Sequence, residues 1–240
     1  MLEYFSPNVY TVLITLAALV PAIILLVMIY RLDKVEKEPS KLLMRLFLFG
    51  VASAFPAALL EQLTDSWILP SLPIQSETLY ILLVALSVGL IEEICKFFFL
   101  FRTTWNHPHF NYRFDGIVYA VFVSLGFAAI ENVLYVFQFG LEVALLRAVL
   151  ALPGHTAFGI FMGAYYGRAK IYQVQGKKSS MTWHLILSYI IAAFLHAFYD
   201  GAAMLGTTPA MIVFFLFVGM MYIITIRLVK KESKEDTSVY

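Results

Sequence analysis

The chain contains 240 residues, of which 61% are hydrophobic and only 14% are charged, and its mean hydropathy is +0.81. A soluble domain cannot hide that much apolar surface, so the composition excludes a soluble globular protein and indicates a polytopic membrane protein. The formal net charge of +1 gives no reason to expect a nucleic acid partner. The single cysteine, Cys95, excludes an intrachain disulfide and a cysteine-rich metal module.

Long apolar runs follow one another along the chain, each close to the roughly 20 residues that a helix needs to cross the bilayer. We therefore predict an all-α helix bundle, a single domain over residues 1–240 that lies in the cell membrane as a multi-pass protein. No Lys or Arg precedes the first run, so we expect a retained helix rather than a cleaved signal peptide. The seven predicted spans are residues 9–30, 42–63, 78–101, 114–139, 141–166, 183–205 and 209–229.

Basic residues alternate between the predicted connections. Lys and Arg occur in the connections after the first, third and fifth spans and in the C-terminal tail, and they are absent from the segment before the first span and from the connections after the second, fourth and sixth. The positive-inside rule then predicts an N-terminus outside and a C-terminus in the cytoplasm. The polar tail, residues 231–240, is expected to be solvated and loosely ordered.

The most informative stretch is GLIEEICKFF in the third predicted span, which contains Glu92, Glu93 and Lys96. Charged side chains deep in a membrane helix are costly, and they are tolerated where they face a protein interior or a water-filled cavity. Glu92 and Lys96 are four residues apart, so they share one helix face and can pair. This stretch predicts a functional site inside the membrane.

Two later spans carry histidines at a comparable depth. His155 and His196 each lie near the middle of their predicted spans, and Asp200 follows His196 by one helical turn, where it can orient the imidazole. Carboxylates that accept a proton from water and imidazoles that donate hydrogen bonds are the groups that a hydrolase needs. Two histidines and a glutamate are also a plausible zinc set.

Simpler structural interpretations stay open for several of these residues. The paired glutamates could be a structural pair that Lys96 and Arg147 neutralise. His155 follows a Pro-Gly pair and could cap an irregular turn. Glu131 and Asp200 are expected to support the site rather than to act on substrate.

Four motifs occur in order in four successive spans, between residues 89 and 201: EEICK, DGIVYAVFVSLGFAAIEN, GHTAFGIFMG and HAFYD. In this combination the chain resembles the PrsW family of intramembrane proteases and, more distantly, the CAAX-prenyl protease and bacteriocin-immunity superfamily. It departs from the wider pattern at Lys96, where an Arg is expected one position later, at Glu131 in place of His, and at Asp200 in place of Asn. The departures leave open whether Glu131 or His155 takes the role of the missing His.

The resemblance implies a membrane-embedded peptidase that cleaves a single-pass anti-sigma factor near the outer face, so that regulated intramembrane proteolysis releases a sigma factor under envelope stress. Our mechanistic hypothesis makes Glu92 or Glu93 the general base. His196 would stabilise the oxyanion or protonate the leaving amine, and His155 would be a second donor.

The sequence leaves alternatives open for both the metal dependence and the class of function. We expect no cofactor, because two adjacent glutamates do not match the zinc-binding pattern His-Glu-x-x-His. If zinc is present, its ligands would be His155, His196 and either Glu92 or Glu93. Intramembrane Glu, His and Asp residues also suit a proton-coupled carrier, although no inverted repeat is visible. A non-catalytic scaffold that holds a partner helix is the third possibility.

Overall fold

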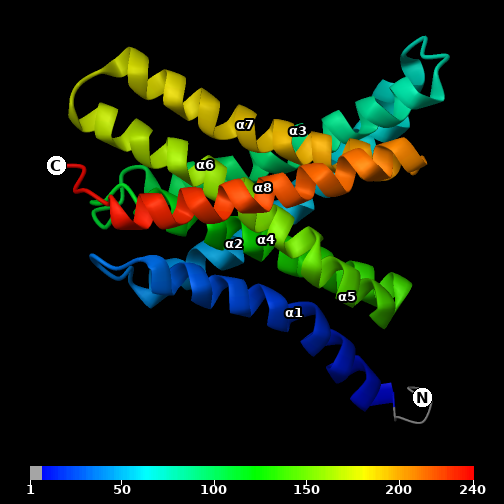
Figure 1. The fold of residues 1–240 in the computed structure, drawn as a ribbon, viewed down its shortest axis with the longest axis horizontal. Coiled ribbons are helices and arrows are strands. Elements are labelled where there is room, and N and C mark those ends of the chain that lie inside the picture. The colour runs from blue at the N-terminus through cyan, green and yellow to red at the C-terminus, as the bar shows by residue number, and fades with distance from the viewer. Residues whose placement is uncertain (1–6) are drawn as a thin grey trace.

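The structure, a computed structural model, describes residues 7–240, which form a helix bundle without a β-strand in that range (Figure 1). A π-helical segment, Thr64–Ile68, and a short 3-10 turn, Leu69–Ser71, extend the second helix. The α-helices are α1 (Pro7–Leu32), α2 (Ser40–Leu63), α3 (Glu77–Thr104), α4 (Asp115–Phe139), α5 (Leu141–Val149), α6 (Ala151–Val174), α7 (Lys178–Met204) and α8 (Thr208–Lys234).

Within the described part of the chain, 7 segments are long and apolar enough to cross a membrane, which confirms the predicted all-α, seven-span architecture. The fifth span differs in detail from the prediction, because it consists of two helices, α5 and α6, that meet at Leu150. Pro153 has no N–H to donate to the carbonyl of Val149, so the helix starts again and the proline lies in the first turn of α6. His155 therefore lies in regular helix, not in an irregular turn.

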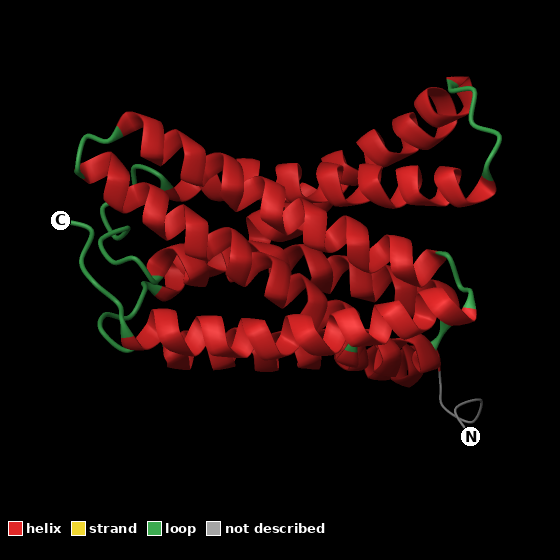
Figure 2. Cartoon of the chain, turned by 45° about the horizontal axis from the view of Figure 1, so that its top comes forward, coloured by secondary structure: helices red, strands yellow, loops and turns green. Residues whose placement is uncertain are grey.

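Five helices surround the middle of the bundle. In this ring α2 packs on α4, α4 on α6, α6 on α7, α7 on α3, and α3 on α2, while α1 covers α4 and α8 covers α6 and α7. The span of α4 is 72% buried, against 22–50% for the other spans, so α4 is the most buried helix of this ring. Figure 2 shows the helices running between two ends of the molecule, with the connecting loops at both.

The two ends differ in charge. We call one the basic end, formed by the connections 33–39, 105–114 and 175–177 and the C-terminal residues 235–240, and the other the opposite end. In Figure 1, α1 begins at the opposite end and α8 ends at the basic end, as seven spans require. That the basic end faces the cytoplasm stays a prediction from the distribution of Lys and Arg.

The expectation of a loosely ordered tail is wrong. Residues up to Lys234 continue α8, and the last residues pair with the α3–α4 connection through a β-bridge between Tyr112 and Ser238. The backbone N–H of Val239 donates to the carbonyl of Asn111 at 2.8 Å, and the Val239 side chain is buried. The tail is ordered because it buries an apolar side chain and satisfies the backbone groups of a loop.

Candidate active site

Three residues on one stretch of α3 form the base of the site. Glu92, Glu93 and Lys96 are all buried, with exposed fractions of 6%, 0% and 1%. One turn earlier Gly89 lies against the backbone of α7, where a Cβ would come within 2.7 Å of the carbonyl oxygen of Ala193. The glycine lets α3 and α7 approach closely, and this places His196 of α7 beside the glutamates.

The Lys96 ammonium is the centre of the polar network. Its Nζ lies 2.9 Å from Glu92 Oε2 and 2.8 Å from Glu93 Oε1, so one cation pairs with both carboxylates. The same atom lies 3.1 Å from His155 Nδ1 and 4.0 Å from the centre of the Phe127 ring. The predicted pairing with Glu92 is confirmed, and an ammonium group with three donors uses all of them here.

The position of Lys96 determines the protonation of His155. An ammonium group can only donate, so His155 Nδ1 must accept and the ring proton must be on Nε2. Nε2 lies 3.0 Å from Glu131 Oε2 and donates to it. His155 is therefore a neutral imidazole with both nitrogens engaged, and this arrangement does not leave it free as a second proton donor.

His196 lies between carboxylates. Its Nδ1 is 2.9 Å from Glu93 Oε1 and 3.8 Å from Glu92 Oε2, and its Nε2 is 3.4 Å from Asp200 Oδ2. Ionised carboxylates only accept hydrogen bonds, so a doubly protonated imidazolium fits this environment. The ring also stacks on Phe158, with 4.7 Å between the ring centres. The expected orientation of His196 by Asp200 agrees with this geometry.

Glu131 also forms an ion pair with an arginine, separate from the pairs that Lys96 makes. Arg147 of α5 lies 2.9 Å from Glu131 Oε2, and its Nε donates to Asn132 Oδ1 at 3.0 Å. Asn132 in turn donates to the carbonyl of Ala18 in α1 at 2.7 Å. The interpretation that Arg147 neutralises the paired glutamates is wrong, because its ionic partner is Glu131.

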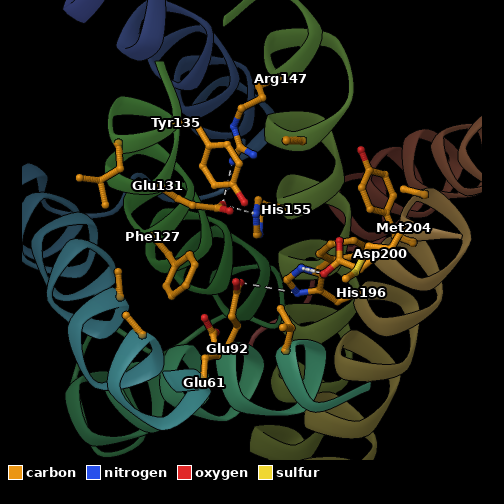
Figure 3. A pocket seen from close by; sticks show the side chains of 18 residues that line it. Glu61, Glu92, Phe127, Glu131, Tyr135, Arg147, His155, His196, Asp200 and Met204 are labelled. Atoms are coloured by element: carbon orange, nitrogen blue, oxygen red, sulfur yellow. Dashed lines mark hydrogen bonds and ion pairs between the residues drawn. The ribbon is translucent and has the colours of Figure 1, made fainter. Parts of the chain in front are cut away.

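Several of these side chains line a cavity of about 420 Å³, whose walls come from α2, α3, α4, α5, α6 and α7 (Figure 3): Glu92, Glu131, Arg147, His155, His196 and Asp200. Glu92 lines the cavity, whereas Glu93 is not among its lining residues. Figure 3 shows His155 and His196 converging from α6 and α7, with their ring centres 5.1 Å apart. The structure thus brings together every residue that the sequence singled out, and it separates the two adjacent glutamates into one that faces the cavity and one behind it.

Two lining residues were not predicted. Glu61 of α2 lines the cavity, and its buried Oε1 accepts no hydrogen bond from the described residues. Tyr135 lies one turn after Glu131, and the Arg147 guanidinium packs over its ring at 4.1 Å. The four-residue spacing from Glu131 was a signal for Tyr135, whereas nothing in the sequence showed that α2 would face α3 at Glu61.

The donor set fits a zinc ion by type and spacing. Glu92, Glu93, His155 and His196 each offer an atom, and these four atoms lie within 4.8 Å of one another. Imidazole nitrogens and carboxylate oxygens are common zinc ligands. Lys96 lies within 3.1 Å of three of these side chains, so a metal ion would have to displace its ammonium group. The chemistry of the donors therefore does not support the expectation of no cofactor.

Comparison with known proteins identifies the family. The model of the "PrsW family intramembrane metalloprotease" matches residues 38–226. The chain belongs to the PrsW family of intramembrane proteases. It is 35% identical over 184 residues to Protease PrsW of Geobacillus kaustophilus, covering 77% of this chain and 76% of that one. It is 33% identical over 222 residues to Protease PrsW of Halalkalibacterium halodurans, covering 92% and 97%.

A further relative, Protease PrsW of Bacillus subtilis, is 35% identical over 184 residues, which cover 77% of this chain and 79% of that protein. No solved structure matches the chain. Membership of the PrsW family confirms the resemblance found in the sequence and makes the protein a multi-pass membrane peptidase, a hydrolase. The matched residues include the whole of the cavity described above.

Proposed function

We propose that this PrsW-family protease cleaves a single-pass membrane anti-sigma factor and so starts a proteolytic cascade that releases a sigma factor. The observation that carries the proteolytic part is the pair Glu92 and His196, a carboxylate and an imidazole that line the same cavity. A base and an acid on one cavity are what hydrolysis of a peptide bond requires. The anti-sigma factor substrate rests on the family resemblance.

In the proposed reaction Glu92 is the general base. It takes a proton from a water molecule, and the water oxygen forms a bond to the scissile carbonyl carbon. His196, as imidazolium, then gives a proton to the amide nitrogen as the C–N bond breaks. The 3.8 Å between His196 Nδ1 and Glu92 Oε2 is short enough for the proton on Glu92 to return to the imidazole after small movements.

The remaining side chains position these two groups. Glu93 accepts from both Lys96 and His196, so it fixes the ring beside the cavity. Lys96 holds the Glu92 carboxylate, and Glu131 keeps the Nε2 proton on His155. When a zinc ion is bound by Glu92, Glu93, His155 and His196, it would supply a polarised water nucleophile.

A cleavage assay in membranes tests the proposal. The chain is co-expressed with a tagged single-pass anti-sigma factor from the same genome, and a shortened product is sought by immunoblotting. We expect product from the unmodified chain and none from Glu92→Gln, Glu93→Gln or His196→Ala. Glu142→Gln, at an exposed carboxylate of α5, is the matched control and should cleave normally.

The outcomes separate the parts of the proposal. Product that persists in all three site variants would mean that another protease cuts and that the carboxylates are structural. No product from any anti-sigma factor, with cleavage of another single-pass protein, would overturn the substrate but keep the peptidase. With purified protein, loss of activity in a chelator and recovery with zinc would show that metal is required.

A further inference from the structure

The break between α5 and α6 at Leu150 lies between two side chains of the active site. Arg147 precedes the break and His155 follows it, yet both contact the same oxygen, Glu131 Oε2, at 2.9 and 3.0 Å (Figure 3). In a straight helix these two positions would lie about 12 Å apart along the axis. How α5 meets α6 is therefore part of the geometry of the site.

The break changes the backbone hydrogen bonding where the two helices meet. The Leu150 N–H donates to the Leu146 carbonyl at 3.0 Å, and the Gly154 N–H donates to the Leu150 carbonyl at 2.9 Å. Pro153, however, has no N–H for the Val149 carbonyl. A carbonyl that loses its helical donor inside a membrane protein needs a donor from a neighbouring helix or side chain.

Tyr222 of α8 supplies a donor at this point. Its hydroxyl lies 3.2 Å from the Val149 carbonyl oxygen and 2.8 Å from the Leu150 carbonyl oxygen, so its one proton is shared between the two. The Tyr222 and Leu150 side chains both pack on one apolar cluster, whose buried members are Ala202, Phe214 and Val218. Helix α8 thus contacts the break through backbone hydrogen bonds and through apolar packing.

Tyr222 does not touch the groups of the proposed reaction. It is not among the residues that line the cavity, and α8 contributes nothing to the cavity walls. Its two acceptors nevertheless lie on the short stretch of chain between Arg147 and His155. Tyr222 can therefore influence the reaction only by fixing how α5 meets α6.

We propose that Tyr222 is a positioning residue of the peptidase site, whose hydroxyl fixes the α5–α6 break and so keeps Arg147 on Glu131. The Arg147 guanidinium holds the Glu131 carboxylate, and Glu131 accepts the Nε2 proton of His155. Without the hydroxyl, α5 is free to move relative to α6, and this ion pair is the first contact to lengthen. The effect on rate rests on the proposed peptidase reaction, but it does not depend on which single-pass protein is cut.

Cleavage kinetics of Tyr222→Phe test the proposal on the anti-sigma factor of the assay above. Phenylalanine keeps the ring in the apolar cluster and removes only the hydroxyl. We expect kcat to fall about 5-fold, the rate equivalent of one neutral hydrogen bond, with KM unchanged. Thr225→Val is the matched control on the same helix, because its buried hydroxyl has no hydrogen-bond partner among the described residues, and it should cleave at the normal rate.

A double-mutant cycle with Arg147→Met separates positioning from a general loss of stability. If Tyr222 acts through Arg147, Tyr222→Phe should lower kcat by less than about 2-fold once the arginine is gone, because the two changes are coupled. Equal losses with and without Arg147 would overturn the proposal. So would a normal kcat in Tyr222→Phe, or a raised KM with kcat unchanged, since the hydroxyl would then not position the reacting groups.

A distance measurement gives a result that does not depend on cleavage. Nitroxide labels are placed at two exposed positions, Leu145→Cys in α5 and Trp183→Cys in α7, in a chain that also carries Cys95→Ala. By double electron–electron resonance in detergent, Tyr222→Phe should broaden the distribution of label distances and Thr225→Val should not. An unchanged distribution in Tyr222→Phe would overturn its role at the break. If the unmodified chain does not cut the anti-sigma factor, the proposed substrate fails and this measurement alone decides the role of Tyr222.

Discussion

Replacing Lys96 by methionine tests whether the site is held together by one buried cation. At an effective dielectric constant of about 20, each of the contacts at 2.9 and 2.8 Å corresponds to about 6 kcal/mol of attraction before desolvation is subtracted. Removing one partner of a buried pair costs about 3–5 kcal/mol, because the other charge stays buried and unpaired. For a chain of this length we expect Tm to fall by about 6–20 °C.

Lys170 provides the matched control for this measurement. It is also buried, but its Nζ donates to neutral acceptors, the Trp105 carbonyl at 2.8 Å and Gln173 Oε1 at 3.0 Å. Lys170→Met leaves no unpaired charge, so its cost should be smaller, about 1–3 kcal/mol. Thermal unfolding of both variants in the same detergent, followed by tryptophan fluorescence, makes the comparison.

A double-mutant cycle gives the result that would refute the reasoning. Glu93→Gln removes one of the two carboxylates that lose their ammonium partner in Lys96→Met, so the double variant should be more stable than the sum of the single changes predicts. Lys170→Met and Glu93→Gln should be additive to within about 0.5 kcal/mol, as for distant sites. If Lys96→Met costs no more than Lys170→Met, or if its effect adds to that of Glu93→Gln, the ammonium does not hold the carboxylates.

Three further predictions follow from other parts of the molecule. Gly89→Ala should push α3 away from α7, because the added Cβ would lie 2.7 Å from the α7 backbone, and the variant should not cleave substrate. The control Gly219→Ala adds a Cβ that faces open space, so this variant should cleave normally. Stability should fall as pH rises from about 4 to about 7, because burial raises the pKa of Asp33 to about 6 and of Glu38 to about 7, so the folded state binds more protons than the unfolded state. Denaturant titrations across pH measure this dependence, and Asp33→Asn with Glu38→Gln should flatten the curve. Arg147→Met should lower kcat about 10-fold, or about 1.4 kcal/mol of barrier, with KM little changed; a variant with normal kcat would mean that the 2.9 Å pair with Glu131 does not position the site.

The sequence predicted the spans because each apolar run has the length that the bilayer requires. It also indicated candidate site residues, because charged groups in such runs are rare: Glu92, Glu93, Lys96, His155 and His196. Periodicity within one helix was sufficient for pairs such as Glu92 and Lys96. It could not assign the partner of Arg147, because that contact depends on how α5 turns at Leu150 and where α4 lies beside it. Contacts between helices follow from packing, which no single span encodes.

The same limit explains why the sequence could not separate the two adjacent glutamates. Neighbouring positions on a helix differ by about 100° in direction, so one of the pair had to face away from any given partner. Which one faces the cavity is decided by the closeness of α3 and α7 at Gly89, a property of two helices together. The burial of Asp33 was missed for a similar reason, because it depends on how the α1–α2 connection packs against the rest of the bundle.

Lys96 also connects the two accounts of how a PrsW protease works. Its ammonium contacts Glu92, Glu93 and His155, three of the four side chains that could hold a metal ion, so a metal and the ammonium compete for the same donors. A glutamate mechanism needs Lys96 where it lies, and a zinc mechanism needs it displaced. Whether zinc can bind therefore depends on the position of the Lys96 side chain. Lys96→Met should raise the affinity for zinc if the four donor side chains coordinate the ion, and it should leave the affinity unchanged if they do not.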